Sequence, residues 1–497
     1  MEVRVVEVVA VINQIDMRKY IAIGVLFLGA VVFAQEKSSE TAGVFKKRVL
    51  ESIEVDFLMS YYSQDGDHAS VTGGIGTEEL TDITPTFIVS LPLNDDDVLT
   101  IEAGISAYTS ASSGNLDPFD SLSGASQGGD DDDDNFSIGS SGGSPWIESS
   151  GASNKDTWVN GNVSYAHSSD DRNSIWTANV NFAAEYDYTS IGFGGGYTKL
   201  FNQKNTELGI KGQVYLDTWQ PRYPTELDSY LEAGKDLNNG FFGGVDILDE
   251  GGRAIDKNGF FVWKPIFEYM NDKSRNTYSI SLSFSQILSK NAQFSLFLDV
   301  VQQSGWLSNP MQRVYFSDTQ NYFIGESEGI PVYDTRANTS VFQLADDIEK
   351  LPSTRFKIPI GIRFNYYINE ITSLRTYYRY YYDDWGIEGH TVNFELPIKI
   401  GGMFTVYPNY RYYKQTAVDY FAPFKEHFST DEFYTSDYDL SGFDSHQFGL
   451  GIKYTDILAK SKLYGFGLKT IDLRYSSYDR SDGLTAGIIS FGIKFVQ

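Results

Sequence analysis

Apolar and polar residues alternate one by one along most of the chain beyond residue 50. This period of two is typical of a β-strand with one apolar and one polar face. In the first such segment Ile53, Val55 and Phe57 lie on one face, while Glu54 and Asp56 lie on the other. The alternation predicts sixteen strands, at residues 53–63, 83–93, 98–109, 156–167, 174–187, 190–201, 206–218, 276–288, 292–304, 355–368, 371–383, 389–400, 403–416, 445–457, 464–478 and 484–496. An even number of strands suits a closed barrel whose two ends lie on the same side.

The connections between these strands alternate in length. Short polar turns, such as residues 94–97 and 290–291, join the strands at one end. The long loops at the other end are residues 110–155, 219–275, 305–354 and 417–444. Because lipid cannot satisfy an unpaired backbone, strands that cross a membrane must close on themselves. We therefore predict an all-β fold, a transmembrane antiparallel β-barrel of about 16 strands within a range of about 14 to 18, with short periplasmic turns and long extracellular loops.

Two local features refine this prediction. The apolar positions change parity between Leu468 and Ile471, which predicts a β-bulge near Lys469 and Thr470. Residues 260–270 also have a strand-like pattern, but counting them as a span would make the number of strands odd. We therefore place them in the long loop at 219–275.

The amino-terminal region has the layout of a secretory signal peptide. A basic start at residues 17–19 precedes an apolar stretch at 20–33, and small residues stand before Gln35. A short hydrophobic core helix is the alternative, but no later segment has the helical periodicity to pack against it. The predicted organisation is a mis-annotated start at 1–16, a signal peptide at 17–34, a short periplasmic segment at 35–52 and the barrel at 53–497.

Composition supports a membrane location. Aromatic residues make up 15% of the 497 residues, as 34 Tyr, 34 Phe and 7 Trp. On the predicted strands Ile, Leu, Val and Phe occupy the middle of the apolar face and Tyr and Trp its ends, as in the aromatic girdles of outer-membrane barrels. A secreted β-solenoid or multi-domain sandwich would need a polar outward face instead. We therefore expect the protein in the lipid bilayer of the cell outer membrane, inserted by the barrel-assembly machinery.

Charge and cysteine content exclude several functions. The formal net charge of −27 argues against a nucleic-acid partner, which would require basic patches. The chain has no cysteine, which excludes disulfides, thiol catalysis and cysteine-ligated metal sites.

The ionisable residues on the inward face separate by sign along the chain. An acidic wall is predicted from the early strands, with Glu54, Asp56, Glu102, Glu185 and Glu207. A basic wall is predicted from the late strands, with Arg363, Arg375, Arg379, Arg411, Arg474 and Lys494. Closure of the barrel would bring Lys494 beside Glu54 and Asp56. Opposed walls of this kind create a transverse field that tunes ion selectivity in a water-filled pore; the alternative is that the charges pair and only brace the lumen.

Metal binding is a candidate function of two loops. The acidic run at 130–134 lacks the alternation of ligands and turn residues that calcium loops have, which favours a solvated surface loop. Asp65, Asp67 and His68, with the acidic pair at 78–79, offer oxygen and imidazole ligands among glycines. We expect no obligatory cofactor, with Ca²⁺ at these acidic loops as the candidate ion and an ordered loop cap as the alternative.

Catalysis is the least favoured function. Asp383 and Asp384 flank one short loop with His390, which would allow a carboxylate–imidazole pair at the rim. No nucleophile motif such as Gly-x-Ser-x-Gly surrounds them. We therefore expect a protein that is not an enzyme, with a rim hydrolase as the alternative.

Four runs resemble a known family. Residues 61–80, 185–190, 304–315 and 377–391 (YYSQDGDHASVTGGIGTEEL, EYDYTS, SGWLSNPMQRVY and YYRYYYDDWGIEGHT) are similar to Gram-negative outer-membrane β-barrels described only as a domain of unknown function. The resemblance implies the fold and the compartment, but no catalytic or binding residues. The resemblance also implies a gene that lies near the genes for a flavin transferase and a small lipoprotein, as is often found in this family. The acidic insertion near Asp130 and the long 219–275 loop depart from the family pattern, so a function carried by these loops does not transfer.

These observations favour a channel. We expect a barrel that passes small polar or ionic solutes through a lumen with opposed acidic and basic walls. The alternative is a non-conducting scaffold or maturation factor for an exported or lipoprotein partner in the periplasm, such as a flavoprotein.

Overall fold

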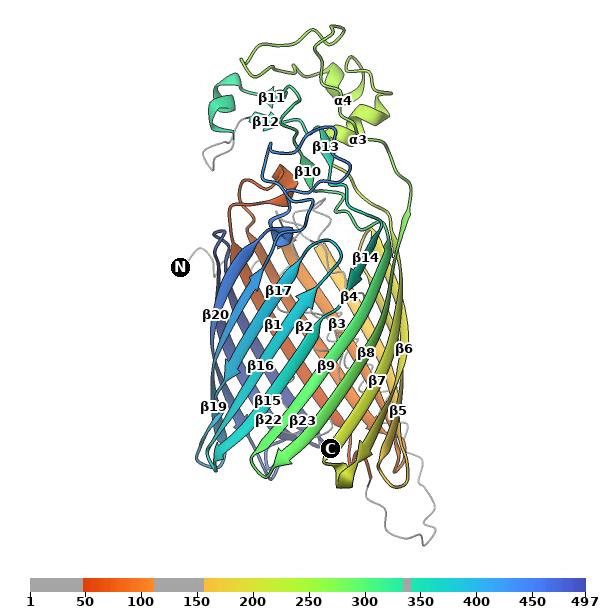
Figure 1. The fold of residues 1–497 in the computed structure, drawn as a ribbon, viewed down its shortest axis with the longest axis vertical. Helices are drawn as coiled ribbons and strands as arrows, with labels where there is room; N and C mark the ends of the chain where they lie inside the picture. Colours follow the sequence, from red (N-terminus) through yellow and green to blue (C-terminus); the bar gives the residue numbers. More distant parts are fainter. Residues whose placement is uncertain (1–47, 111–155, 334–340) are drawn as a thin grey trace. The chain divides into compact units, whose positions relative to one another are not determined.

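Sixteen antiparallel spans close into a β-barrel in the computed structural model, which describes residues 48–110, 156–333 and 341–497 (Figure 1). The predicted all-β class and strand number are confirmed. The strands are β1 (Glu54–Asp65), β2 (Leu80–Pro92), β3 (Asp97–Ser110), β4 (Asp156–Ser168), β5 (Ser174–Ala184), β6 (Tyr188–Phe201), β7 (Thr206–Trp219), β8 (Lys273–Ser289), β9 (Ala292–Gly305), β14 (Thr354–Lys357), β15 (Ile360–Asn369), β16 (Thr372–Tyr382), β17 (Glu388–Glu395), β18 (Ile398–Ile400), β19 (Phe404–Gln415), β20 (Phe443–Thr455), β21 (Lys462–Leu463), β22 (Phe466–Arg480) and β23 (Thr485–Val496).

The last strand closes the barrel against the first. β23 pairs with β1 from Val496 opposite Glu54 to Thr485 opposite Asp65. Each remaining span pairs with its neighbours in sequence order. Closure leaves no strand edge exposed, as a lipid environment requires.

Two spans are interrupted by proline. Pro359 separates β14 from β15, and Pro397 separates β17 from β18. Proline has no backbone N–H to donate to the neighbouring strand, so the pairing stops for one or two residues. β21 is a two-residue pairing within the turn before β22. For these reasons the sheet counts as 19 strand segments although the chain crosses sixteen times.

The outward face of the barrel is apolar and exposed. Val180 is 58% exposed, Ile280 54% and Leu450 57%. Apolar side chains exposed all around a closed barrel find a favourable environment only in hydrocarbon. The protein therefore lies in the bilayer of the outer membrane. No helix in the described part of the chain is long and apolar enough to cross a membrane.

The predicted bulge is present at its expected place. The register between β22 and β23 shifts between Leu468 and Thr470. Residues 260–270, whose pattern is strand-like, form no strand and are part of a loop as expected. The predicted signal peptide and the acidic run at 130–134 lie outside the described residues.

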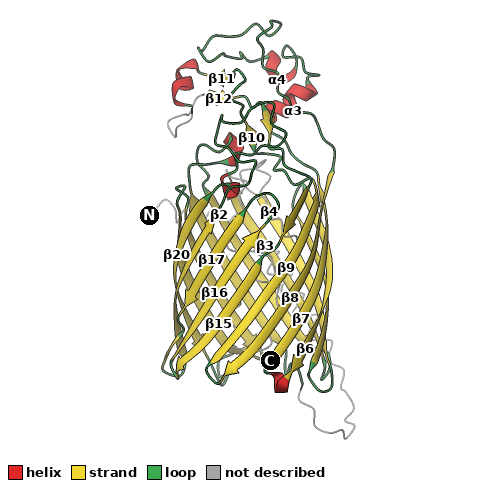
Figure 2. Cartoon of the chain, viewed as in Figure 1, coloured by secondary structure: helices red, strands yellow, loops and turns green. Residues whose placement is uncertain are grey.

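The long connections fold together beyond one end of the barrel (Figure 2). We call residues 66–79, 220–272, 306–333, 341–353 and 416–442 the cap. Its elements are η1 (Ser70–Thr72), α3 (Thr225–Glu232), α4 (Gly240–Gly243), β10 (Arg313–Val314), β11 (Phe323–Gly325), η3 (Ser327–Val332), β12 (Val341–Gln343), β13 (Asp347–Ile348) and η4 (Tyr438–Leu440). At the opposite end, η2 (Asn202–Lys204) lies in the turn between β6 and β7.

The cap has its own hydrophobic core. Leu227 and Tyr230 of α3 pack with Phe242 of α4, Trp263 and Ile348, and all five are buried. Trp263 Nε1 donates to the Ala345 carbonyl across 2.9 Å. β10 pairs with β13, and β11 pairs with β12, as two small sheets outside the barrel. These loops are therefore a folded structure built from segments far apart in the sequence.

Candidate functional site

The inward-facing side chains of the late strands form a row of bases and aromatic rings. Arg363 of β15 pairs with Tyr377 of β16. Tyr377 pairs with Asn393 of β17, which pairs with Arg411 of β19. Directly opposed residues of an antiparallel pair point to the same face, and so do residues two apart in one strand. Arg363, Arg411 and, two residues along β16, Arg379 therefore share one region of the lumen wall.

The bases nearer the periplasm are neutralised by carboxylates. Arg375 Nη1 lies 3.0 Å from Glu395 Oε1, and Arg474 Nη1 lies 3.3 Å from Glu395 Oε2. Arg474 Nε also lies 3.0 Å from Asp472 Oδ1. Glu395 is thus shared between two guanidinium groups, so these residues brace the wall.

The seam between the first and last strands is also ion-paired. Lys494 Nζ lies 3.0 Å from Glu54 Oε2 and 3.7 Å from Asp56 Oδ2. Lys469 Nζ lies 3.4 Å from Glu54 Oε1. The structure therefore places the predicted neighbours together, at the periplasmic end of the barrel.

The other members of the predicted acidic wall are spread along the barrel axis. Glu207 lies at the periplasmic end of β7, and Glu102 is buried in β3. The predicted strand at 174–187 is too long, because β5 ends at Ala184 and Glu185 N donates to the Tyr188 carbonyl in a tight hairpin turn. Glu185 therefore lies at the extracellular rim, where its carboxylate accepts a hydrogen bond from the Tyr108 hydroxyl.

Aromatic rings hold the lumen arginines against the wall. The Arg363 guanidinium carbon lies 5.4 Å from the centroid of the Phe297 ring and 5.9 Å from that of Tyr377. Arg379 lies 5.8 Å from the Tyr381 ring by the same measure. A cation within about 6 Å of a ring centroid is attracted to the ring face. These contacts orient the guanidinium groups.

Glycines make room for the large lumen side chains. A Cβ atom at Gly361 would lie 3.0 Å from the Tyr377 hydroxyl, and one at Gly451 would lie 2.9 Å from Arg474 Cγ. Gly451 pairs directly with Arg474. Gly361 pairs with Arg379, which stands two residues from Tyr377 on β16. The side chains can therefore lie along the wall rather than across the lumen.

A collar of inward-facing aromatic residues lies at the extracellular end of the barrel. Trp158 contacts Tyr188 with ring centroids 5.7 Å apart, and Tyr188 contacts Trp219 at the same distance. Trp219 contacts Trp306, which contacts Tyr223 of the cap. The collar thus continues into the cap core.

Buried ion pairs hold the loops of the cap together. Arg313 donates through Nε and Nη2 to the two carboxylate oxygens of Glu226, at 2.7 and 2.9 Å. Its Nη1 donates to the carbonyl of Val71. Arg313 therefore joins three of the loops that form the cap.

A second junction joins the cap to the barrel rim. Arg480 of β22 pairs with Asp439 and Asp482, and donates to the Tyr438 carbonyl at 2.9 Å. Glu78 lies in the same region. Burial, together with the charges of Asp439 and Asp482, raises the pKa of the Glu78 carboxyl to about 8. Loop 66–79 therefore carries a carboxyl group that takes up a proton near neutral pH.

The predicted metal ligands Asp65, Asp67 and His68 do not converge. His68 Nδ1 lies 3.0 Å from the Gly74 carbonyl, and His68 Nε2 lies 3.1 Å from the Asp482 carbonyl. Its ring stacks on Tyr438 with centroids 3.5 Å apart. Among the described residues no group of three or more candidate ligands is placed to hold a metal ion. His68 here joins loop 66–79 to its neighbours, as the alternative of an ordered loop cap proposed.

The predicted carboxylate–imidazole pair is not formed. Asp383 is buried, and its carboxylate accepts hydrogen bonds from Arg355 Nε at 2.9 Å and from the Tyr381 hydroxyl at 2.8 Å. His390 is exposed, and its Nδ1 lies 2.9 Å from the Tyr378 hydroxyl. The period of two places His390 on the outward face of β17, so the two side chains lie on opposite sides of the wall.

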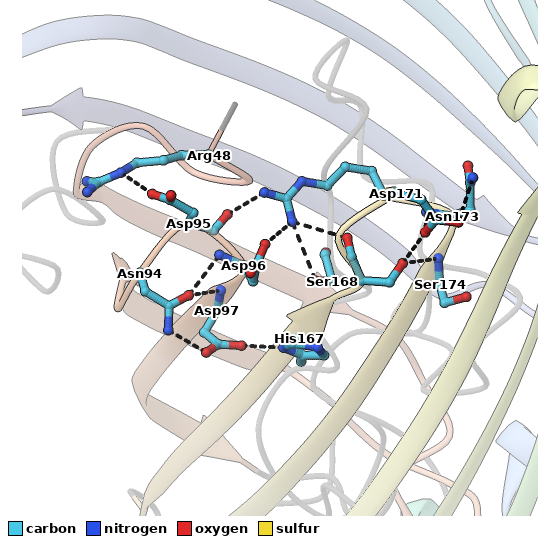
Figure 3. Close-up of polar contacts among 12 residues, drawn as sticks. Arg48, Asn94, Asp95, Asp96, Asp97, His167, Ser168, Asp171, Asn173 and Ser174 are labelled. Carbon is cyan, nitrogen blue, oxygen red and sulfur yellow. Dashed lines mark hydrogen bonds and ion pairs between the residues drawn. The ribbon is translucent and has the colours of Figure 1, made fainter. Parts of the chain in front are cut away.

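The periplasmic turns are tied by a separate polar network (Figure 3). Arg172 pairs with Asp96 and donates to the Asp95 carbonyl at 2.7 Å, which joins the β4–β5 turn to the β2–β3 turn. Arg48 Nε lies 2.8 Å from Asp95 Oδ1. Hydrogen bonds from the Ser169 hydroxyl and from Asn173 lower the pKa of Asp171 to about 2. This network stabilises the periplasmic turns and is separate from the charged residues of the lumen wall.

Sequence reasoning missed the arginines that act outside the predicted wall. Arg355 stands two residues before Lys357 on the same strand, so its parity already indicated an inward position. Arg313 had no such signal, because its partners Glu226 and Val71 come from distant loops. Arg480 has the inward parity of Arg474, but it lies two residues beyond the predicted strand at 464–478.

The chain matches one family model and is similar to solved structures at low sequence identity. Residues 23–480 match the family model "Protein of unknown function (DUF3570)". The outer membrane protein opdK from Pseudomonas aeruginosa is 7% identical, with a TM-score of 0.35 over 90% of this chain and 99% of that chain. A Pseudomonas aeruginosa FadL homologue is 9% identical, with a TM-score of 0.36 over 90% of both chains. A search of curated proteins gave no match.

The family match covers most of the chain, including every span of the barrel except the last. Together with the closed barrel and its lipid-facing exterior, this coverage assigns the chain to an outer-membrane family. The chain belongs to the DUF3570 family of proteins of unknown function.

Proposed function

We propose that the barrel is a channel that passes small polar or ionic solutes across the outer membrane. The observation that carries this proposal is the distribution of charge on the inward face, with bases gathered on β15, β16, β19 and β22. A barrel of about 16 strands is wide enough for an aqueous channel. Solutes would then pass between a basic wall and a wall of acidic and neutral polar residues.

Planar bilayers test this proposal. The purified protein is expected to give single-channel currents whose size depends on salt concentration. Replacing both Arg375 and Arg379 with Ala should shift the reversal potential in a salt gradient toward cation preference, since two positive charges leave the wall. Arg48→Ala, which changes a base at the periplasmic turns, is the matched control and should leave the reversal potential unchanged. Silence of the wild-type protein would contradict the channel.

A non-conducting scaffold for a periplasmic or lipoprotein partner is the second candidate. The turn between β20 and β22 favours it, because Tyr464 is 97% exposed and Ile457 is 74% exposed at the periplasmic end. Exposed apolar residues beyond the membrane are typical of protein contacts. A scaffold predicts no currents and an amine-reactive crosslink from the exposed Lys460 of this turn to a periplasmic protein, which Tyr464→Ser with Ile457→Ser would abolish.

A rim hydrolase is not supported by the geometry, since Asp383 and His390 face opposite sides of the wall. The absence of a nucleophile motif in the sequence points the same way. We therefore propose a transport or scaffold role rather than a catalytic one.

A further inference from the structure

Arg363 of β15 differs from several other bases of the lumen in its surroundings. Arg375 and Arg474 share Glu395, and Lys494 lies between Glu54 and Asp56. For Arg363, by contrast, its close contacts within the described residues are the rings of Phe297 and Tyr377, and no carboxylate forms an ion pair with it. A charged group held by rings alone retains most of its ability to bind an anion.

Tyr377 is the centre of this group. It pairs with Arg363 across the β15–β16 register, and Arg379 stands two residues along the same strand. Thr391 of β17 pairs with Arg379 on one side and with Tyr413 on the other, and Tyr413 stands two residues from Arg411 on β19. Three guanidinium groups and two phenol hydroxyls are therefore brought to one part of the concave wall. All of them are able to donate hydrogen bonds to an oxyanion.

Asp299 and Lys211 lie on strands next to this group. Both pair with Ser281 of β8, Asp299 from β9 and Lys211 from β7. The neighbouring strands therefore add one acid and one base to the three arginines.

From this juxtaposition we infer an oxyanion-binding site in the lumen, formed by Arg363, Arg379 and Arg411 around Tyr377. Its ligand is a small solute with a carboxylate or phosphate group, because guanidinium groups bind these planar or tetrahedral oxyanions with two parallel hydrogen bonds. The inference rests on the proposed function in one respect, that the lumen admits solutes. It adds the class of solute and the place where the solute pauses.

Equilibrium binding to the full-length protein in nanodiscs tests the site, by calorimetry with succinate and with inorganic phosphate in a low-chloride buffer. Saturable binding of either anion is expected, with no binding of choline. Arg363→Gln, Arg379→Gln or Arg411→Gln should each weaken binding about tenfold or more, since each removes a charge-assisted hydrogen bond. Lys494→Gln, which changes a base that is ion-paired at the periplasmic seam, is the matched control and should change affinity less than about threefold.

The outcomes separate the site from the channel. Binding of succinate alone would specify a carboxylate ligand, and binding of phosphate alone a phosphorylated one. Arg363→Lys keeps the charge but loses the planar fork, so affinity between that of the wild type and that of Arg363→Gln would support guanidinium recognition. Absent saturable binding, or equal effects of Arg363→Gln and Lys494→Gln in variants with unchanged circular dichroism, would overturn the site even if currents are found. Saturable binding without currents would overturn the channel and leave the site.

Discussion

The barrel and the cap direct their apolar side chains oppositely. In the barrel Ile280 is 54% exposed and faces lipid, whereas in the cap Ile247 is 1% exposed and lies in a core. The barrel has ion pairs such as Arg375 with Glu395 on its inward face, and the cap buries pairs such as Arg313 with Glu226. The difference shows that one chain folds in two environments, with the barrel in lipid and the cap in water. Strands that cross lipid are stabilised by closure and by hydrocarbon, while the cap needs a core of its own.

The largest effect is expected from Arg313→Ala in the cap. The change leaves the Glu226 carboxylate buried without its partner, which costs about 3–5 kcal/mol of the free energy of cap unfolding. Hydrogen exchange should become faster in residues 220–272 and stay unchanged in β15 and β16. The double change of Arg313 and Glu226 to Leu should recover most of the protection. Equal acceleration in the barrel strands would show that the cap and the barrel unfold as one unit.

The next effect concerns pH and the junction between the cap and the rim. The folded protein raises the pKa of Glu78 from 4.5 to about 8, so it binds this proton more tightly than the unfolded chain. The resulting stability is complete below about pH 4.5 and is lost as the pH rises through 8, on the order of a few kcal/mol. The protection factors of residues 66–79, that is exchange rates corrected for the intrinsic rise of exchange with pH, should therefore fall between pH 6 and pH 9. Glu78→Gln should remove this dependence, and a pH profile that persists in the variant would contradict the assignment.

A smaller effect compares the two apolar environments directly. Ile247→Val removes one methylene from the cap core and should cost about 0.5–1.5 kcal/mol of cap stability. Ile280→Val makes the same change on the lipid-facing surface, where fluid acyl chains fill the space. Proteolysis of the cap should accelerate for the first variant alone. Similar acceleration for both would mean that the cap depends on the lipid-facing surface.

The smallest effect is expected at the periplasmic turns. Arg48 and Asp95 form an ion pair in which both side chains are about half exposed. Such exposed pairs contribute at most about 1 kcal/mol, because water screens them. Arg48→Ala should therefore leave the thermal unfolding midpoint of the barrel nearly unchanged. A large drop would show that the turn network of Figure 3 matters more than its exposure indicates.

Most of the barrel could be predicted from the sequence because its signal is local. Each span repeats a two-residue pattern, and even the bulge at Leu468 to Thr470 appeared as a change of parity. The ends of spans were less predictable. Glu185 continued the inward parity of β5, but the tight hairpin that ends this strand depends on pairing with β6.

The candidate site was predictable only in part. Parity placed Arg363 on the inward face, but it did not distinguish this ring-contacting base from Arg375 and Arg474, which share Glu395. That distinction depends on which strands are neighbours and in which register. The metal and hydrolase predictions assumed that residues close in the sequence share a face, whereas Asp383 and His390 face opposite sides of the wall.

The sequence by itself determined the all-β class, the sixteen crossings and the compartment. The alternation, the turn residues and the aromatic belts are local patterns that involve only residues close together in the sequence. The tertiary structure alone decided that the long loops form a cap, since Arg313, Glu226 and Val71 come together from three loops. It also decided which lumen charges are neutralised. Both outcomes depend on contacts between distant residues, whose free energy arises only when burial and register bring the partners together.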